Sequence, residues 1–167
     1  MAVTRIAING FGRIGRNAFK IANERSDLEI VAINDLTDTK TLAYLLKHDS
    51  NYGEYGRQVD FTENELIIEG KSIKVLAEKD PENLPWRDLN IDVVIESTGF
   101  FTDKDGASKH LTAGAKRVVI SGPTKSEGVD TIVLGTNDDK VKKFCNKSAN
   151  VESKGNDPIW KTLLVVL

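Results

Sequence analysis

The sequence contains a single cysteine, Cys145, among its 167 residues. This excludes an internal disulfide framework and is typical of a reducing compartment. No apolar run approaches the roughly 20 residues that a membrane-spanning helix needs, and the opening residues Met1–Arg5 lack the apolar segment of a secretion signal. Neither sign of charge dominates, because 23 Lys and Arg face 25 Asp and Glu. We therefore expect a cytoplasmic protein with neither a nucleic-acid nor a membrane partner.

Short apolar, β-branched runs alternate along the chain with segments whose apolar residues have helical spacing. The expected strands are Arg5–Ile8, Leu28–Ile33, Ile91–Ile95, Arg117–Ile120 and Thr131–Leu134, and the expected helices are Ile14–Asn23, Thr39–Leu46 and Asp103–Ala113. A hairpin is expected where Glu69–Lys71 separates Leu66–Ile68 from Ile73–Val75. This alternation predicts an α/β fold, namely a Rossmann-type, doubly wound, mostly parallel sheet with helices on both faces.

A glycine-rich motif lies at the first junction between a strand and a helix, where Gly10, Gly12 and Gly15 have G-x-G-x-x-G spacing. Such glycines allow a tight turn, a close approach of the backbone to a pyrophosphate, and close packing of helix on strand. The N–H groups and the dipole of the following helix favour the negative phosphates. The spacing alone is weak evidence, but its position between a strand and a helix predicts a dinucleotide site.

An acidic residue, Asp35, follows Gly15 by 20 residues and lies in the polar pair Asn34–Asp35 that ends the second expected strand. A carboxylate at this position accepts hydrogen bonds from the adenine-side ribose, and it repels the 2′-phosphate of NADP. The sequence therefore favours NAD as the cofactor. The alternative is that Asp35 caps the next turn, near Thr37 and Asp38, and the two roles can coexist.

Several longer motifs resemble, in the same order, those of glyceraldehyde-3-phosphate dehydrogenases. They are Ile8–Arg16, Asn34–Asp38, Leu45–Ser50, Glu96–Phe101 and Gly114–Ser121. The resemblance covers roughly residues 3–140. It implies an NAD-binding Rossmann domain over residues 1–140, and it leaves residues 141–167 as an unassigned tail outside the family pattern.

The resemblance also implies which residues contact NAD. They are Gly10, Gly12, Arg13, Ile14, Gly15, Asp35, Lys79, Thr98, Phe101 and Ser121. Arg13 and Ile14 match the turn whose backbone meets the pyrophosphate, and Ser121 matches a residue near the nicotinamide-side ribose. The alternative for Ser121, which precedes Gly122 and Pro123, is that it is only a turn residue.

The remaining three matches concern the adenine ring. Lys79 stands where the family has a basic residue beside the adenine, and Thr98 and Phe101 match the pair that flanks the ring, where an aromatic face supplies stacking area. Two alternatives stay open: Lys79 is a solvated surface charge, or Phe101 is a core residue.

The family's catalytic segment, Ser-Cys-Thr-Thr-Asn-Cys, does not occur in this sequence. Its first cysteine is the nucleophile of the family, whereas Cys145 has the neighbours Phe144 and Asn146, so we assign no catalytic role to it. His48 and His110 match stretches that look structural in the family. The tail ends in the apolar run Leu163–Leu167, which we expect to be an exposed, association-prone end; either a shifted reading frame or a natural divergent end would explain it.

Two functions remain open. The first is the NAD-binding half of a glycolytic, phosphorylating glyceraldehyde-3-phosphate dehydrogenase, inactive by itself, with glyceraldehyde 3-phosphate as a partner only if a catalytic domain is supplied. The second is a non-catalytic dinucleotide-binding module or degenerate product. Within the family, erythrose-4-phosphate dehydrogenase shares the glycine loop, although Asn34–Leu36 favours the glyceraldehyde enzyme. The family is homotetrameric, but we do not extend that assembly to this chain.

Overall fold

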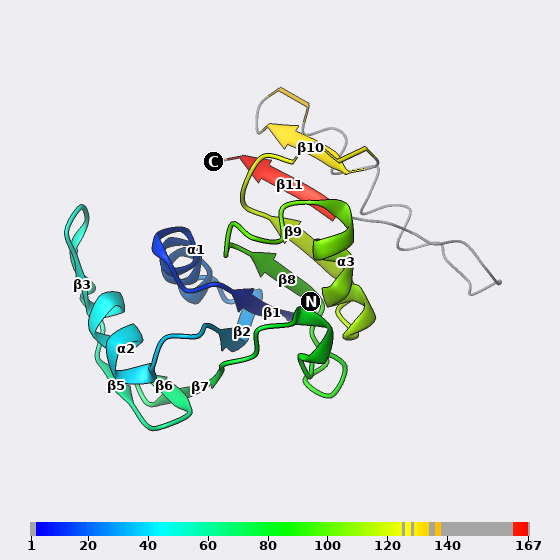
Figure 1. The fold of residues 1–167 in the computed structure, drawn as a ribbon. Coiled ribbons are helices and arrows are strands. Elements are labelled where there is room, and N and C mark those ends of the chain that lie inside the picture. Colours follow the sequence, from blue (N-terminus) through cyan, green and yellow to red (C-terminus); the bar gives the residue numbers. More distant parts are fainter. Residues whose placement is uncertain (1–2, 125, 128, 134–135, 138–161, 167) are drawn as a thin grey trace.

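A computed structural model describes residues 3–124, 126–127, 129–133, 136–137 and 162–166 (Figure 1). Its main feature is a nine-stranded sheet of order β10-β11-β9-β8-β1-β2-β7-β6-β5. The strands are β1 Thr4–Asn9, β2 Leu28–Asn34, β5 Val59–Phe61, β6 Glu65–Ile68, β7 Lys71–Leu76, β8 Val93–Glu96, β9 Arg117–Ile120, β10 Asp130–Val133 and β11 Thr162–Val166. Neighbours from β10 to β7 run parallel, and β7, β6 and β5 are antiparallel. The predicted Rossmann-type, mostly parallel sheet is confirmed.

The three predicted helices are present with nearly the expected bounds, as α1 Arg13–Asn23, α2 Thr39–Lys47 and α3 Lys104–Thr112. A short 3-10 helix, η1, spans Pro81–Asn83, and β3 (His48–Asp49) and β4 (Gly53–Glu54) form a separate two-stranded hairpin. Asp38 and Asp103 cap α2 and α3, because their side chains accept hydrogen bonds from Thr41 N and Gly106 N. Each cap satisfies a backbone N–H that has no partner within its helix.

Helices cover both faces of the sheet, as predicted. Side chains alternate between the faces of a strand, so Ile8 of β1 packs in one buried cluster with Phe19 of α1. Ala7 points to the opposite face, together with Val94 of β8. The next strand on that face, β9, packs against Ala107 of α3. Thus α1 and α3 lie on opposite sides of the central strands (Figure 1).

The predicted hairpin joins β6 to β7 through a tight turn. Ile68 pairs with Lys71, which leaves Glu69 and Gly70 as the two loop residues. Both have positive φ, 50° and 82°, as a type I′ turn requires. The turn matches the right-handed twist of the flanking strands.

The apolar run near the end of the chain forms a strand, β11, which the sequence did not predict. The backbone of β11 pairs in parallel with β9 on one side and β10 on the other. A run of leucine and valine is typical of strands inside parallel sheets, whose two faces are both covered. Most of the predicted tail, including Cys145, lies outside the described residues.

The helices of the described part of the chain are short or polar. None of them is long and apolar enough to cross a membrane.

Removing Phe19 tests the packing of α1 on the sheet. Its side chain is fully buried, and its ring meets that of Phe11 edge-on, with centroids 5.5 Å apart. Because Phe19→Ala leaves a cavity, we expect it to lower the free energy of unfolding by about 3–5 kcal/mol in urea denaturation. Ile21→Ala on the same helix is the control, since Ile21 is 60% exposed, and it should change stability by less than about 0.5 kcal/mol. Equal losses in the two variants would contradict this packing.

Candidate cofactor site

The candidate site lies where the winding of the sheet reverses. β1 has β2 on one side and β8 on the other, and the chain reaches these neighbours in separate excursions. In open α/β sheets, the crevice outside the carboxyl ends of the strands at such a point binds ligands. Gly10 follows β1 directly and Ser97 follows β8 directly. The glycine motif is therefore at the switch point.

Two glycines of the motif lie in places where no side chain fits. Gly10 has φ +90°, and a Cβ atom on it would lie 2.6 Å from Thr98 N. A Cβ atom on Gly15 would overlap the carbonyl oxygen of Gly10. These contacts bring α1 against the β1–α1 turn and the turn against the loop after β8, as a close-packed dinucleotide turn requires.

The middle glycine has the opposite surroundings. A Cβ atom on Gly12 would have no neighbour within 4 Å, so the turn leaves open space at this point. Gly12 is also the N-cap of α1, without a side-chain cap and without an acidic residue in the first turn of the helix. Arg13 and Ile14 are exposed at the start of this helix. An open, uncapped helix N-terminus suits an anionic group, and the arrangement fits a diphosphate.

Asp35 joins the glycine turn to the end of β2. Its Oδ2 accepts a hydrogen bond from Phe11 N at 2.6 Å, and its Oδ1 accepts one from Thr37 N at 2.9 Å. The carboxylate is half-buried. The turn-capping alternative thus occurs in the structure, through Thr37, and the bond to Phe11 places the same carboxylate beside the glycine motif.

The other predicted contact residues lie on loops at the same edge. Thr98 is half-buried and donates to Glu96 from both its N and its Oγ1. Ser121 is half-buried after β9, and its N donates to the carbonyl oxygen of Glu96. Phe101 is half-buried beside Gly106 of α3, and Lys79 is exposed on the loop after β7. The contacts link Thr98 to the glycine turn, whereas Lys79 and Phe101 lie on flanking loops.

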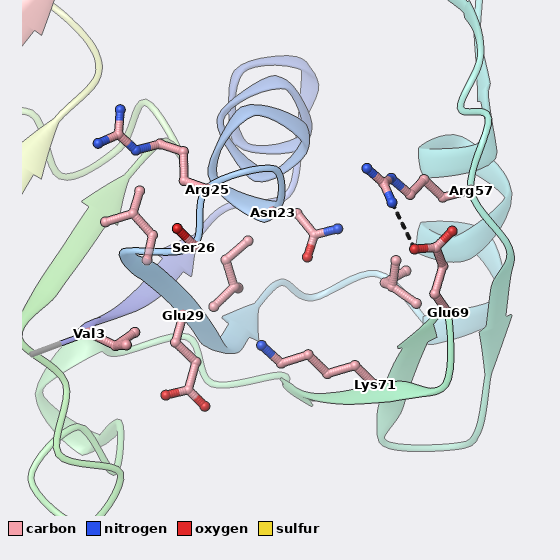
Figure 2. A pocket seen from close by; sticks show the side chains of 11 residues that line it. Val3, Asn23, Arg25, Ser26, Glu29, Arg57, Glu69 and Lys71 are labelled. Atoms are coloured by element: carbon pink, nitrogen blue, oxygen red, sulfur yellow. Dashed lines mark hydrogen bonds and ion pairs between the residues drawn. The ribbon is translucent and has the colours of Figure 1, made fainter. Parts of the chain in front are cut away.

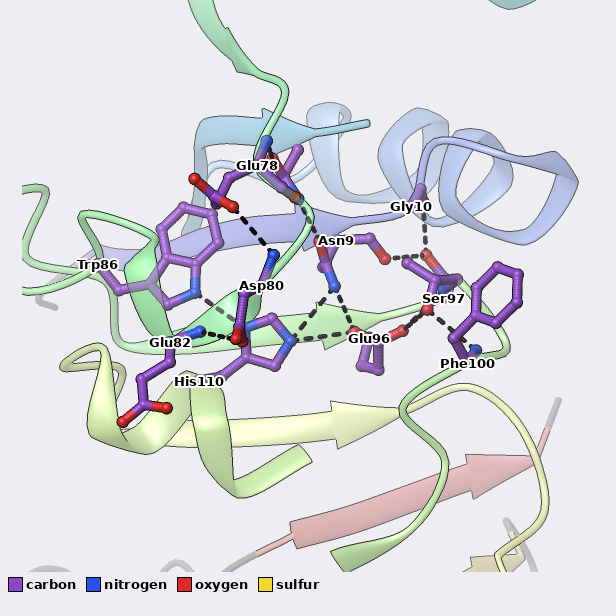
Figure 3. Close-up of polar contacts among 12 residues, drawn as sticks. Asn9, Gly10, Glu78, Asp80, Glu82, Trp86, Glu96, Ser97, Phe100 and His110 are labelled. Carbon is purple, nitrogen blue, oxygen red and sulfur yellow. Dashed lines mark hydrogen bonds and ion pairs between the residues drawn. The ribbon is translucent and has the colours of Figure 1, made fainter. Parts of the chain in front are cut away.

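A buried polar network that the sequence did not predict lies beside these loops, and it consists of Asn9, Asn34, Trp86, Glu96 and His110 (Figure 3). All five side chains are buried. The available signal was a polar residue at the carboxyl end of each of three apolar strands. His110, which we expected to be structural, is one of its members.

Next to this network, Lys109 Nζ lies 3.0 Å from Asp80 Oδ1. The hydrogen bond from Lys109, together with one from Glu82 N, holds the pKa of Asp80 below its usual value. The carboxylate is therefore charged at neutral pH and fastens the loop after β7 to α3.

A cavity of about 530 Å³ lies elsewhere, at the amino ends of β2 and β7 (Figure 2). Its charged lining is largely paired, since Arg57 contacts Glu69 at 2.8 Å and Glu29 contacts Arg5 at 2.7 Å. The cavity and the glycine turn occupy opposite ends of the parallel strands. Among the described residues, no cluster of three His, Cys, Asp or Glu could hold a metal ion.

Comparison with known proteins shows the family to which the chain is similar. The family described as the glyceraldehyde 3-phosphate dehydrogenase NAD-binding domain matches residues 4–104. The chain is 56% identical over 142 residues to the glyceraldehyde-3-phosphate dehydrogenase of Thermotoga maritima, covering 84% of this chain and 42% of that protein. It is 55% identical over 140 residues to that of Geobacillus stearothermophilus, covering 84% and 41%.

A third relative, the glyceraldehyde-3-phosphate dehydrogenase of Borreliella burgdorferi, is 52% identical over 166 residues, covering 95% of this chain and 49% of that protein. This match extends past residue 140. The chain spans less than half the length of each of the three relatives.

Alanine at two glycines tests the geometry of the turn. Gly15→Ala places a methyl group on a backbone carbonyl, so we expect the free energy of unfolding to fall by about 3 kcal/mol. Gly12→Ala places the same group in open space at φ −70°, and it should cost less than about 1 kcal/mol. Thermal melting of the two variants measures the difference. A reversed order would show that the turn has a different shape.

Proposed function

This chain belongs to the glyceraldehyde 3-phosphate dehydrogenase family and carries its NAD-binding domain, so NAD is its cofactor, and on this basis we propose which residues hold NAD and what reaction it serves. The open space at Gly12, between two glycines that admit no side chain, is the observation that carries the proposal. It is where a diphosphate approaches the backbone.

The pyrophosphate binds to the start of α1, at Gly12, Arg13 and Ile14. Support comes from the exposed, uncapped N-terminus of this helix, whose N–H groups and dipole favour negative charge. Asp35 accepts hydrogen bonds from the adenosine ribose. Its bond to Phe11 N supports this role, because it keeps the carboxylate beside the glycine turn. Gly10 and Gly15 allow the turn to pack closely, because a side chain at either position would overlap the backbone.

The adenine lies between the loops after β7 and β8, near Lys79, Thr98 and Phe101, and Ser121 lies on the nicotinamide side. The half-buried positions of Thr98, Phe101 and Ser121, on loops that follow neighbouring strands, support this assignment. NAD supplies the hydride acceptor of the reaction, and the chain's own residues bind and orient it.

The reaction that this site serves is the oxidation of an aldehyde by a phosphorylating dehydrogenase of glycolysis, in the cytoplasm. Glyceraldehyde 3-phosphate is its substrate when a catalytic segment is supplied. The second candidate is a non-catalytic NAD-binding module, which is favoured by the absence of Ser-Cys-Thr-Thr-Asn-Cys from the 167 residues. Binding of NAD without turnover of glyceraldehyde 3-phosphate supports the module, and turnover supports the enzyme. Turnover of erythrose 4-phosphate instead would reassign the substrate within the family.

Titration with NAD by calorimetry tests the site itself. We expect Gly12→Ala to weaken NAD binding by about tenfold or more, since the methyl group occupies the space of the diphosphate. The melting temperature without NAD should stay close to that of the unchanged chain. Equal NAD affinity in the two proteins would place the diphosphate elsewhere.

Asp35→Ala tests the ribose contact. Loss of hydrogen bonds to a charged group should weaken NAD binding by about 1–3 kcal/mol. The preference for NAD over NADP should shrink, because the repulsion of the 2′-phosphate is lost. Asp35→Asn is the matched control, since it removes the charge but keeps an oxygen that can accept from Phe11 N. Unchanged affinity of Asp35→Ala for both cofactors would exclude Asp35 as the ribose partner.

A further inference from the structure

The buried polar network joins the ends of three strands at the carboxyl edge of the sheet. Asn9, Asn34 and Glu96 are the last residues of β1, β2 and β8, and their exposed fractions are only 1%, 4% and 1%. His110 of α3 is 0% exposed. Burying this many polar groups costs free energy even when each has a partner, and an apolar cluster of the same size stabilises a core as well or better. Stability alone therefore does not explain why these polar side chains are buried together.

Trp86 sets the direction of the hydrogen bonds. The indole N–H can only donate, and it lies 2.9 Å from His110 Nδ1, so Nδ1 is the acceptor and carries no proton. The proton of the neutral ring is then on Nε2, which lies 3.0 Å from Glu96 Oε2 and donates to it. Trp86 and Glu96 thus hold the ring in one tautomer, and Asn9 Nδ2, which lies 3.3 Å from the same Nε2, donates to Glu96 rather than to the ring (Figure 3).

Four donors converge on the carboxylate of Glu96. Oε2 accepts from His110 Nε2 at 3.0 Å and from Asn9 Nδ2 at 2.5 Å. Oε1 accepts from Thr98 N at 2.8 Å and from Thr98 Oγ1 at 2.5 Å. Thr98 Oγ1 in turn accepts from Phe100 N at 3.1 Å. The buried side chains of His110 and Asn9 thus orient Oε2, and Oε1 holds the loop after β8 through Thr98.

The second arm of the network holds the loop after β7. Asn9 Oδ1 accepts from Asn34 Nδ2 at 2.7 Å, which fixes the orientation of the Asn34 amide. That amide then makes two hydrogen bonds with the backbone of Glu78: Nδ2 donates to its carbonyl oxygen, and Oδ1 accepts from its N, both at 2.9 Å. The residue held in this way directly precedes Lys79.

We propose that the buried polar network is a positioning device for the adenosine half of NAD, in which His110 orients Glu96 to hold Thr98 while Asn9 orients Asn34 to hold the loop that carries Lys79. This inference rests on the proposed function, because Thr98 and Lys79 are its assumed adenine contacts. Because its side chains are buried, the network acts through the loops that it holds and not by contacting the ligand. It sets the separation of two loops before the ligand arrives, so less ordering remains to be done on binding.

Glu96→Gln is the main test. All four contacts of the carboxylate are with donors, so either orientation of the amide places its NH₂ group against two of them. We expect the dissociation constant for ADP-ribose, measured by calorimetry on the full chain, to rise about tenfold. The amide signals of Thr98 and Phe100 in ¹⁵N-resolved NMR spectra should move without ligand.

Two further variants separate positioning from stability. His110→Gln keeps a donor toward Glu96, and it should bind ADP-ribose within about threefold of the unchanged chain, whereas His110→Leu should lose about tenfold. Val118→Ala is the matched control, because Val118 is fully buried against α3 and outside the network. It should lower the melting temperature but leave the ADP-ribose affinity unchanged.

The outcomes are distinct. If the unchanged chain binds neither NAD nor ADP-ribose, both the proposed function and this inference fail. If it binds, and Glu96→Gln and Val118→Ala bind ADP-ribose equally well, the inference alone fails. If His110→Leu does not fold, the ADP-ribose affinities of Glu96→Gln and Val118→Ala still test whether the network positions the two loops.

Discussion

Parallel pairing of β1 with both β2 and β8 is the constraint on which the site depends. Parallel neighbours end at the same edge of a sheet, so the turn after β1 necessarily lies between the residues that follow β2 and β8. The close contact of Gly10 with Thr98 and the hydrogen bond from Phe11 to Asp35 are consequences of this register. A side chain at Gly10 would push the two sides of the site apart.

The two carboxylates at this edge of the sheet, Asp35 and Glu96, differ in their burial and in their hydrogen-bond partners. Asp35 is half-buried beside the open glycine turn and uses its oxygens on two backbone N–H groups, which leaves lone pairs for further donors. Glu96 is fully enclosed, and all its donors come from the protein. One carboxylate therefore keeps lone pairs available for a ligand, and all the hydrogen bonds of the other are to its own fold.

Much of the fold could be predicted from the sequence, because apolar periodicity and glycine spacing are local properties. The helices α1, α2 and α3 and the hairpin at Gly70 were predictable for this reason. The partners of buried polar groups were not, since Asn9 and Glu96 are 87 residues apart and meet only through the sheet register. The strand β11 was missed because no periodicity distinguishes a strand inside a sheet from an unpaired apolar end when its neighbours are unknown.

The position of β11 has a consequence for how the sheet is completed. β9 ends at Ile120 and β10 begins at Asp130, yet these successive strands are not neighbours, because β11, which begins only at Thr162, lies between them. During synthesis, the edge of β9 stays without its partner until residues 162–166 have left the ribosome. An unpaired strand edge is a template for association with other chains, and pairing between segments far apart in the sequence is slow. The strand β11 thus covers the edge of β9, and β10 becomes the outer strand on that side of the described sheet.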